Sequence, residues 1–124
     1  MGVTGIGGIF LRAYNKQALS KWYADHLGIG GDDWGTWQQQ AGTTYFSPFA
    51  HDSDYFPTDK QIMLNYRVEG LEALLDKLRA AGIDVITKPE WNDPSIGNFA
   101  RIYDPEGNPI ELWEAPVESG AASA

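Results

Sequence analysis

The feature of this sequence that most constrains its fold is an internal duplication. Each half runs in the same order, with a strand, a helix, a glycine that ends the helix, and further strands. An offset of about 55 residues aligns IFLR at 9–12 with LNYR at 64–67, and Gly28 with Gly82. A βαβββ unit of this kind cannot cover both faces of its own sheet. The duplication therefore predicts that the two units pack together.

The first half contains one well-delimited helix and three candidate strands. Asn15 is a good N-cap residue for a helix over 16–27, and Gly28 is suited to end it. Apolar residues recur every three or four positions along this segment, which predicts one buried face. Segments rich in aromatic and β-branched residues predict the strands. These strands are expected at 6–13, 36–40 and 43–47.

The second half repeats the pattern more clearly. A strand is predicted over 62–68 and a helix over 71–81, with leucines on one face of the helix. Three further extended elements follow, at 85–88, 98–103 and 109–114. We therefore predict one domain over 1–114, with module one at about 6–49, a linker at 50–60, module two at about 61–114, and a mobile tail at 115–124.

The predicted fold class is α+β. Two βαβββ modules are expected to form a curved mixed sheet around a cup, with the helices outside. The chain is long enough to bury a core as a single domain.

The segment 102–114, IYDPEGNPIELWE, is predicted to be a strand, a tight turn and a second strand. Asp104 is placed to cap the turn, Pro105 fixes φ, and Gly107 tolerates left-handed backbone. The alternation after the turn places Glu111 and Trp113 on the same side of the last strand. What Glu111 faces is therefore the central functional question.

Composition narrows the classes of partner. The chain has 9 basic and 17 acidic residues, a net charge of −8, which argues against nucleic acid and anionic membranes. It has no cysteine, which excludes disulfides, thiolate metal sites and a cysteine nucleophile. No apolar run is long enough to span a membrane, and the N-terminus lacks signal-peptide features. A cytoplasmic protein with a small-molecule partner is the expectation.

The two modules, the opening GIGGIFLRA…WYADHLGI and the closing DPEGNPIELWE resemble the glyoxalase/bleomycin-resistance/dioxygenase superfamily, the vicinal oxygen chelate fold. The resemblance extends from Ile6 to Glu114. It implies a cup that commonly holds one divalent metal through four side chains, two from each module. It also implies chemistry ranging from isomerisation to ring-cleaving dioxygenation, alongside metal-free members that bind drugs. Family members commonly form homodimers.

Transferring the family's metal ligands onto this chain leaves only one of them in place. Glu111 matches the ligand of the closing motif, whereas the other positions fall on Gly8, Tyr45 and Met63. Glycine has no donor, and methionine sulfur suits soft metals rather than those usual in this fold. The resemblance therefore predicts a member without the usual metal site and without a cofactor, although a divalent metal is not excluded.

Strand alternation predicts which side chains line the cup. If position 8 points inward, Phe10 does too, and the same parity selects alternate residues on the other strands. The predicted ligand-binding residues are Phe10, Tyr45, Met63, Asn65, Arg67, Arg101 and Trp113. Such an aromatic cup with a few polar groups is typical of a small-molecule pocket. A core filled by these same side chains is the competing interpretation.

Glu111 without a metal needs a hydrogen-bond or ionic partner, because a buried lone carboxylate is costly. The candidates are Arg101 and Arg67 as cations, and Tyr45 and Asn65 as donors. Three functions stay open at this point. The first is binding of a small organic molecule by a metal-free homodimer. The second is a metal-dependent lyase, isomerase or dioxygenase. The third is a cofactor-free enzyme with Glu111 as the catalytic acid or base.

Overall fold

The computed structural model describes residues 2–116. The chain divides into two compact units, and the boundary between them in the sequence lies between Trp37 and Gln38. The tail predicted over 115–124 lies outside the described residues from position 117 onward. None of the helices in the described part is both long and apolar enough to cross a membrane.

The first unit is built on the helix α1, Lys16–Leu27, as predicted. Asn15 Oδ1 accepts a hydrogen bond from the Ala18 amide at 3.0 Å, which satisfies one of the free donors of the first turn. Gly28 ends the helix in the left-handed region at φ 68°. Leu19 and Tyr23 are buried on the apolar face. The local sequence signals are sufficient to explain this element.

The strands predicted over 6–13, 36–40 and 43–47 do not form among the described residues. A strand needs a neighbouring backbone with which to form a ladder of hydrogen bonds, and no such ladder is present at these segments in the described residues. Their apolar side chains are largely exposed, with Ile6 at 62% and Phe10 at 94%. The prediction of a complete βαβββ module in the first half is therefore not confirmed, because a propensity for strand structure does not by itself supply a pairing partner.

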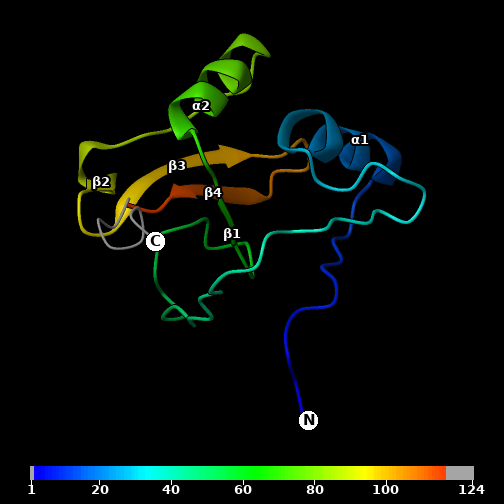
Figure 1. Ribbon diagram of the computed structural model, residues 1–124, viewed down its shortest axis with the longest axis horizontal. Helices are drawn as coiled ribbons and strands as arrows, with labels where there is room; N and C mark the ends of the chain where they lie inside the picture. The colour runs from blue at the N-terminus through cyan, green and yellow to red at the C-terminus, as the bar shows by residue number, and fades with distance from the viewer. Residues whose placement is uncertain (1, 117–124) are drawn as a thin grey trace. The chain divides into compact units, whose positions relative to one another are not determined.

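The second unit is an open, mixed four-stranded sheet with one helix, as Figure 1 shows. Its strands lie in the order β1-β4-β3-β2, with β1 and β4 parallel and the other pairs antiparallel. The prediction of α+β structure is confirmed, but the cup of two modules is not. The elements are β1 (Leu64–Arg67), α2 (Leu71–Ala80), a 3₁₀ turn η1 (Pro89–Trp91), β2 (Asn92–Asp93), β3 (Gly97–Tyr103) and β4 (Pro109–Glu114).

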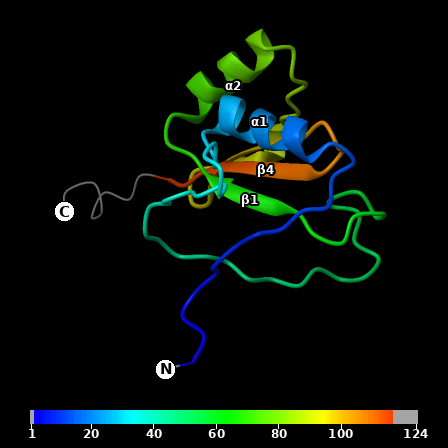
Figure 2. The same ribbon diagram turned by 90° about the vertical axis from the view of Figure 1, so that its right-hand side faces the viewer.

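The apolar core lies between α2 and one face of this sheet. Ile102 of β3 is opposite Ile110 of β4, and both are almost completely buried. Leu75 and Leu78 are the buried side chains of α2, and α2 makes direct contacts with β4. In both Figure 1 and Figure 2, α2 lies over one face and the chain that precedes β1 passes the other. The second face is therefore the one free to carry polar groups.

The beginning of α2 is held by the end of β4. The N-cap residue of α2 is Gly70, which has no side chain to satisfy the first amides. The Glu114 carboxylate replaces that function by accepting hydrogen bonds from Gly70 N at 2.9 Å and Leu71 N at 3.2 Å. A negative group at this position also interacts favourably with the helix dipole. The closing motif thus ties the helix to the sheet.

The turn between β3 and β4 has the chemistry that its sequence predicts. Asp104 Oδ1 accepts from the amides of Glu106 at 2.8 Å and Asn108 at 3.0 Å. Its Oδ2 accepts from the Asn108 side chain at 2.8 Å, and Gly107 has a positive φ of 82°. The turn sets the register of the two strands. It thereby fixes which face Glu111 occupies.

Candidate functional site

The sheet face opposite α2 carries a row of three polar side chains, one from each of three strands. Glu111 of β4 is opposite Asn65 of β1 on one side and Arg101 of β3 on the other. Residues directly opposite each other in a sheet point to the same side. We call this side the Glu111 face, and define it by Asn65, Arg67, Phe99, Arg101, Glu111 and Trp113.

Glu111 is buried, with 8% of its surface exposed, and each of its oxygens accepts a hydrogen bond. Asn65 Nδ2 donates to Oε1 at 2.8 Å, as the sequence predicted. The Tyr55 phenol donates to Oε2 at 2.5 Å, a contact that the sequence analysis did not foresee. Hydrogen bonds to a carboxylate are among the stronger ones in proteins. Each oxygen of this buried carboxylate therefore has a hydrogen-bond donor from within the chain.

Arg101 is buried still further, at 5% exposed, yet it does not form an ion pair with Glu111. The ion pairs Lys21–Asp25 and Arg79–Asp76 lie elsewhere in the described chain. Arg101 instead donates to the Tyr55 carbonyl oxygen at 2.9 Å and to the Tyr103 hydroxyl at 3.4 Å. Its guanidinium also lies over two aromatic rings, 5.2 Å from the centroid of Tyr55 and 5.7 Å from that of Trp91.

Tyr55 therefore joins both charged groups from the linker that precedes β1. Burial, the hydrogen bond to Glu111 and the charge of that carboxylate raise the pKa of the Tyr55 phenol to about 12. Arg101 acts in the opposite direction through its charge and hydrogen bonding. The phenol stays protonated across the physiological range and serves as a fixed donor. The rings of Phe49 and Trp91 flank it, with centroids 5.7 and 6.2 Å away.

The other end of the Glu111 face is aromatic. Trp113 stacks on Phe99 with ring centroids 6.0 Å apart and an interplanar angle of 10°. Tyr45 meets the same indole edge-on at 5.8 Å, and Trp113 Nε1 donates to the Ile96 carbonyl at 2.9 Å. Tyr45 is 73% exposed, so this cluster presents ring surface to solvent. Exposed aromatic surface beside a satisfied carboxylate suits an aromatic ligand.

The structure places the remaining predicted residues as follows. Arg67 is used structurally, since its guanidinium donates to the carbonyls of Gln40 at 2.8 Å and Ala41 at 3.3 Å. Tyr45 contacts Trp113 instead of donating to Glu111, so that part of the expectation was wrong. Met63 is half-buried immediately before β1. Phe10 belongs to the first unit, and its side chain is exposed.

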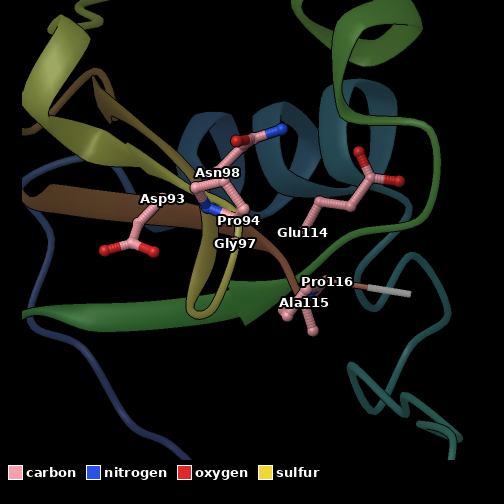
Figure 3. A pocket seen from close by; sticks show the side chains of 7 residues that line it. All are labelled: Asp93, Pro94, Gly97, Asn98, Glu114, Ala115 and Pro116. Carbon is pink, nitrogen blue, oxygen red and sulfur yellow. The ribbon is translucent and has the colours of Figure 1, made fainter. Parts of the chain in front are cut away.

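A shallow depression of about 410 Å³ lies at the end of the sheet beyond Trp113, shown in Figure 3. Its two carboxylates point away from each other, and both are already engaged within the chain. Asp93 Oδ1 accepts from the Ser95 amide and hydroxyl, which lowers the pKa of Asp93, and Glu114 caps α2. This depression is not the candidate site, because its two carboxylates already accept hydrogen bonds from within the chain.

The residues present do not fit the metal that the superfamily commonly holds. Gly8 offers no donor, and Met63 offers only a thioether. Tyr45 is engaged with an indole, and both Glu111 oxygens accept hydrogen bonds. Among the described residues, no three His, Cys, Asp or Glu side chains gather closely enough to hold an ion. We derive no chemical step through a metal.

Two residues of the site were missed from the sequence, Tyr55 and Trp91. Tyr55 lies in a segment without periodicity, and it meets Glu111 across 56 positions of sequence. Trp91 is the last residue of the 3₁₀ turn Pro89–Trp91, which the sequence patterns did not predict. The concentration of aromatic residues between Pro48 and Lys60 was the available signal. When a linker is rich in aromatic residues but lacks the periodicity of a helix or strand, its aromatic side chains can be expected to pack against another element of the fold.

Comparison with known proteins supports the fold. No family model matches the sequence, and none of the curated proteins matches it either. Among solved structures, the chain is similar to TnmS3, an antibiotic binding protein from Streptomyces sp. CB03234, with a TM-score of 0.59 and 18% identity. The similarity covers 93% of this chain and 98% of that one. At this identity it shows a shared fold alone.

A weaker similarity exists to a structure described as Oxidase ChaP-H2. Its TM-score is 0.41 at 18% identity, covering 87% of this chain and 91% of the other. A likeness at this level carries no argument about the present protein. The fold and the Glu111 face together define an α+β protein with a polar and aromatic sheet face, which shares its fold with an antibiotic-binding protein.

Proposed function

We propose that this protein is a metal-free member of the glyoxalase/bleomycin-resistance/dioxygenase superfamily that binds a small aromatic molecule on the Glu111 face. The observation that carries the proposal is the stacked Phe99–Trp113 pair with Tyr45 at its edge, on the same sheet face as the hydrogen-bonded Glu111. Flat apolar rings next to a few oriented polar groups are typical of small-molecule sites. The shared fold with TnmS3, described as an antibiotic binding protein, supports the same direction.

Catalysis by Glu111 is less well supported. A general base must be free to take a proton from a bound substrate. Both oxygens of Glu111 accept hydrogen bonds from within the chain, and its tyrosine partner has a pKa raised to about 12, which makes it a poor acid at neutral pH. Glu111 is better suited to orient a ligand than to transfer a proton.

The charge of the protein favours neutral or cationic ligands. The net charge is −8, and the aromatic rings of Trp113 and Phe99 attract cations through their faces. A screen of aromatic and cationic aromatic compounds by thermal shift tests the proposal directly. A ligand present at about 100 times its Kd stabilises the folded state by about 2.7 kcal/mol, which is readily measured.

Two tryptophan variants make the test specific to the site. Trp113→Leu removes the stacked indole, whereas Trp34→Leu removes an exposed indole of the first unit. We expect the first variant to weaken binding at least tenfold and the second to leave it unchanged. Failure of every aromatic compound to stabilise the protein would contradict the proposal, and so would equal losses in the two variants.

We also propose that the protein functions as a homodimer. The segment 6–13 is extended, carries exposed apolar side chains and has no strand partner in the described chain. In the sheet of the second unit, β1 is an edge strand. Exposed apolar surface and unpaired strand edges both favour association with another chain. Sedimentation equilibrium of the wild type is expected to give twice the mass of one chain. The variant Ile9→Asp, which places a charge in the exposed apolar segment, is expected to be a monomer. A monomeric wild type would refute the proposed homodimer.

A further inference from the structure

The Tyr55 phenol occupies a position that is defined by two groups of opposite hydrogen-bonding character. The Glu111 carboxylate can only accept hydrogen bonds, and its Oε2 accepts one from the Tyr55 phenol at 2.5 Å. The Arg101 guanidinium donates only, and its centre lies 5.2 Å from the Tyr55 ring centroid. A group seated between them must donate to the first and accept from the second. Among uncharged groups carried on a ring, a hydroxyl meets both requirements.

The surroundings of this position are aromatic on several sides. Phe49 and Trp91 flank the Tyr55 ring, and Lys88 lies 5.2 Å from the Trp91 ring centroid. The hydroxyl that fits here is therefore one attached to an aromatic ring. Tyr55 supplies such a group from the linker, which forms neither helix nor strand at that residue.

One buried hydrogen-bond donor of Arg101 has no acceptor in this arrangement. Among the described residues, its Nε is the buried side-chain polar atom without a hydrogen-bond partner. A buried donor left unpaired costs free energy that a better-placed acceptor would recover. Only 5% of the Arg101 surface is exposed, and its guanidinium carbon lies 5.2 Å from the centroid of the Tyr55 ring. The subsite thus retains capacity for a further ligand oxygen.

We propose that Tyr55 is a displaceable internal ligand, and that the subsite between Glu111 and Arg101 takes the hydroxyl of an aromatic alcohol. This inference rests on the proposed function, because it names the class of ligand that the Glu111 face binds. Binding exchanges one phenol for another, so the linker moves away while Glu111 keeps a donor. Such an exchange reduces the apparent affinity by the fraction of molecules in which Tyr55 has left the subsite.

The first test measures affinity for 2-naphthol and for its methyl ether with the full chain. In Tyr55→Phe the competing hydroxyl is gone, and Glu111 gains a charge-assisted hydrogen bond only when the probe binds. We expect 2-naphthol to bind this variant about tenfold to a hundredfold more tightly than the wild type. The methyl ether meets the same weakened competitor in this variant but cannot donate to Glu111, so we expect it to bind both proteins at least tenfold more weakly than 2-naphthol. Equal affinities of 2-naphthol for the two proteins would overturn the proposal.

The second test does not depend on the natural ligand. Tyr55→Gly removes the phenol, and added p-cresol has the size and the hydroxyl of the missing side chain. We expect p-cresol to raise the thermal midpoint of Tyr55→Gly more than 4-methylanisole does, and we expect Glu111→Gln in the same background to abolish the difference. The matched control is Tyr45→Gly, which removes an exposed tyrosine that contacts Trp113, and which p-cresol should not stabilise beyond the wild type.

The two proposals fail in distinguishable ways. If aromatic compounds bind through Trp113 but p-cresol does not distinguish Tyr55→Gly from Tyr45→Gly, the protein is a small-molecule binder and the Tyr55 subsite is refuted. If p-cresol rescues Tyr55→Gly selectively but no aromatic compound stabilises the wild type, the subsite stands and the proposed function fails. If Tyr55→Gly does not fold, the affinities of Tyr55→Phe decide alone.

Discussion

Removing one oxygen atom from Tyr55 is the sharpest perturbation that the structure suggests. Tyr55→Phe keeps the ring contacts with Phe49 and Trp91 and deletes only the donor to Glu111. A hydrogen bond to a charged group contributes about 1.5–3 kcal/mol to stability. Because Glu111 is 8% exposed, solvent replaces the lost donor poorly. We expect the free energy of unfolding to fall by about 1.5–3 kcal/mol, within the range of that hydrogen bond.

Urea denaturation, followed by tryptophan fluorescence, measures this loss with the wild type and variant side by side. The matched control is Tyr45→Phe, which removes a hydroxyl from a tyrosine that is 73% exposed. Surface substitutions of that kind usually change stability by less than about 0.5 kcal/mol. The reasoning is refuted if the two variants lose the same amount. It is also refuted if Tyr55→Phe costs as much in the Glu111→Gln background as in the wild type, since the coupling energy of the two residues would then be zero.

Three further predictions follow from other contacts. Glu114→Ala removes the acceptor for the amides of Gly70 and Leu71, and should cost about 0.5–2 kcal/mol in urea denaturation, whereas Glu114→Gln should recover part of that loss. The raised pKa of Tyr55 means that the folded state holds the phenol proton more tightly than the unfolded state does. The stability that this proton contributes is therefore present below pH 10 and is lost as the pH rises through about 12. Tyrosinate absorbance should show a late-titrating phase, and this phase should be smaller in Tyr55→Phe. Gly97→Ala should cost about 1–3 kcal/mol, because φ is 121° and the new methyl group would overlap the Glu114 carbonyl oxygen; a normal thermal midpoint would contradict this.

Local sequence signals predicted the elements whose causes are themselves local. Asn15 and Gly28 fixed both ends of α1, since each satisfies a neighbouring backbone group. Asp104 and Gly107 fixed the turn for the same reason, and the turn then determined the register of β3 and β4. That register places Arg101 opposite Glu111, whereas Asn65 is placed opposite Glu111 by the separate pairing of β1 with β4. The predictions of the helix ends and of the turn are confirmed, because each of these features depends on only one or two neighbouring residues.

The errors arose where a structure depends on distant partners. The segment 6–13 has strand composition, but a strand forms only against a second backbone, and the described chain does not supply one. Tyr55 lies in the linker, and nothing within ten residues of it reveals that it contacts Glu111. Periodicity detects a face of a regular element, so it cannot detect the target of a side chain in an irregular segment.

The position of the linker, and not the sheet alone, determines the electrostatics of the Glu111 face. Glu111 and Arg101 are register partners on adjacent strands, yet they do not pair with each other. Each is instead engaged by Tyr55, the carboxylate through the phenol and the guanidinium through the backbone carbonyl and the ring. Lifting Tyr55 would leave two opposite charges without these partners in a largely buried setting, which is costly unless new partners arrive. A ligand that offers a donor to one and an acceptor to the other removes that cost. Under the proposed displacement of Tyr55, Glu111 and Arg101 therefore favour a ligand whose hydroxyl and ring resemble those of tyrosine.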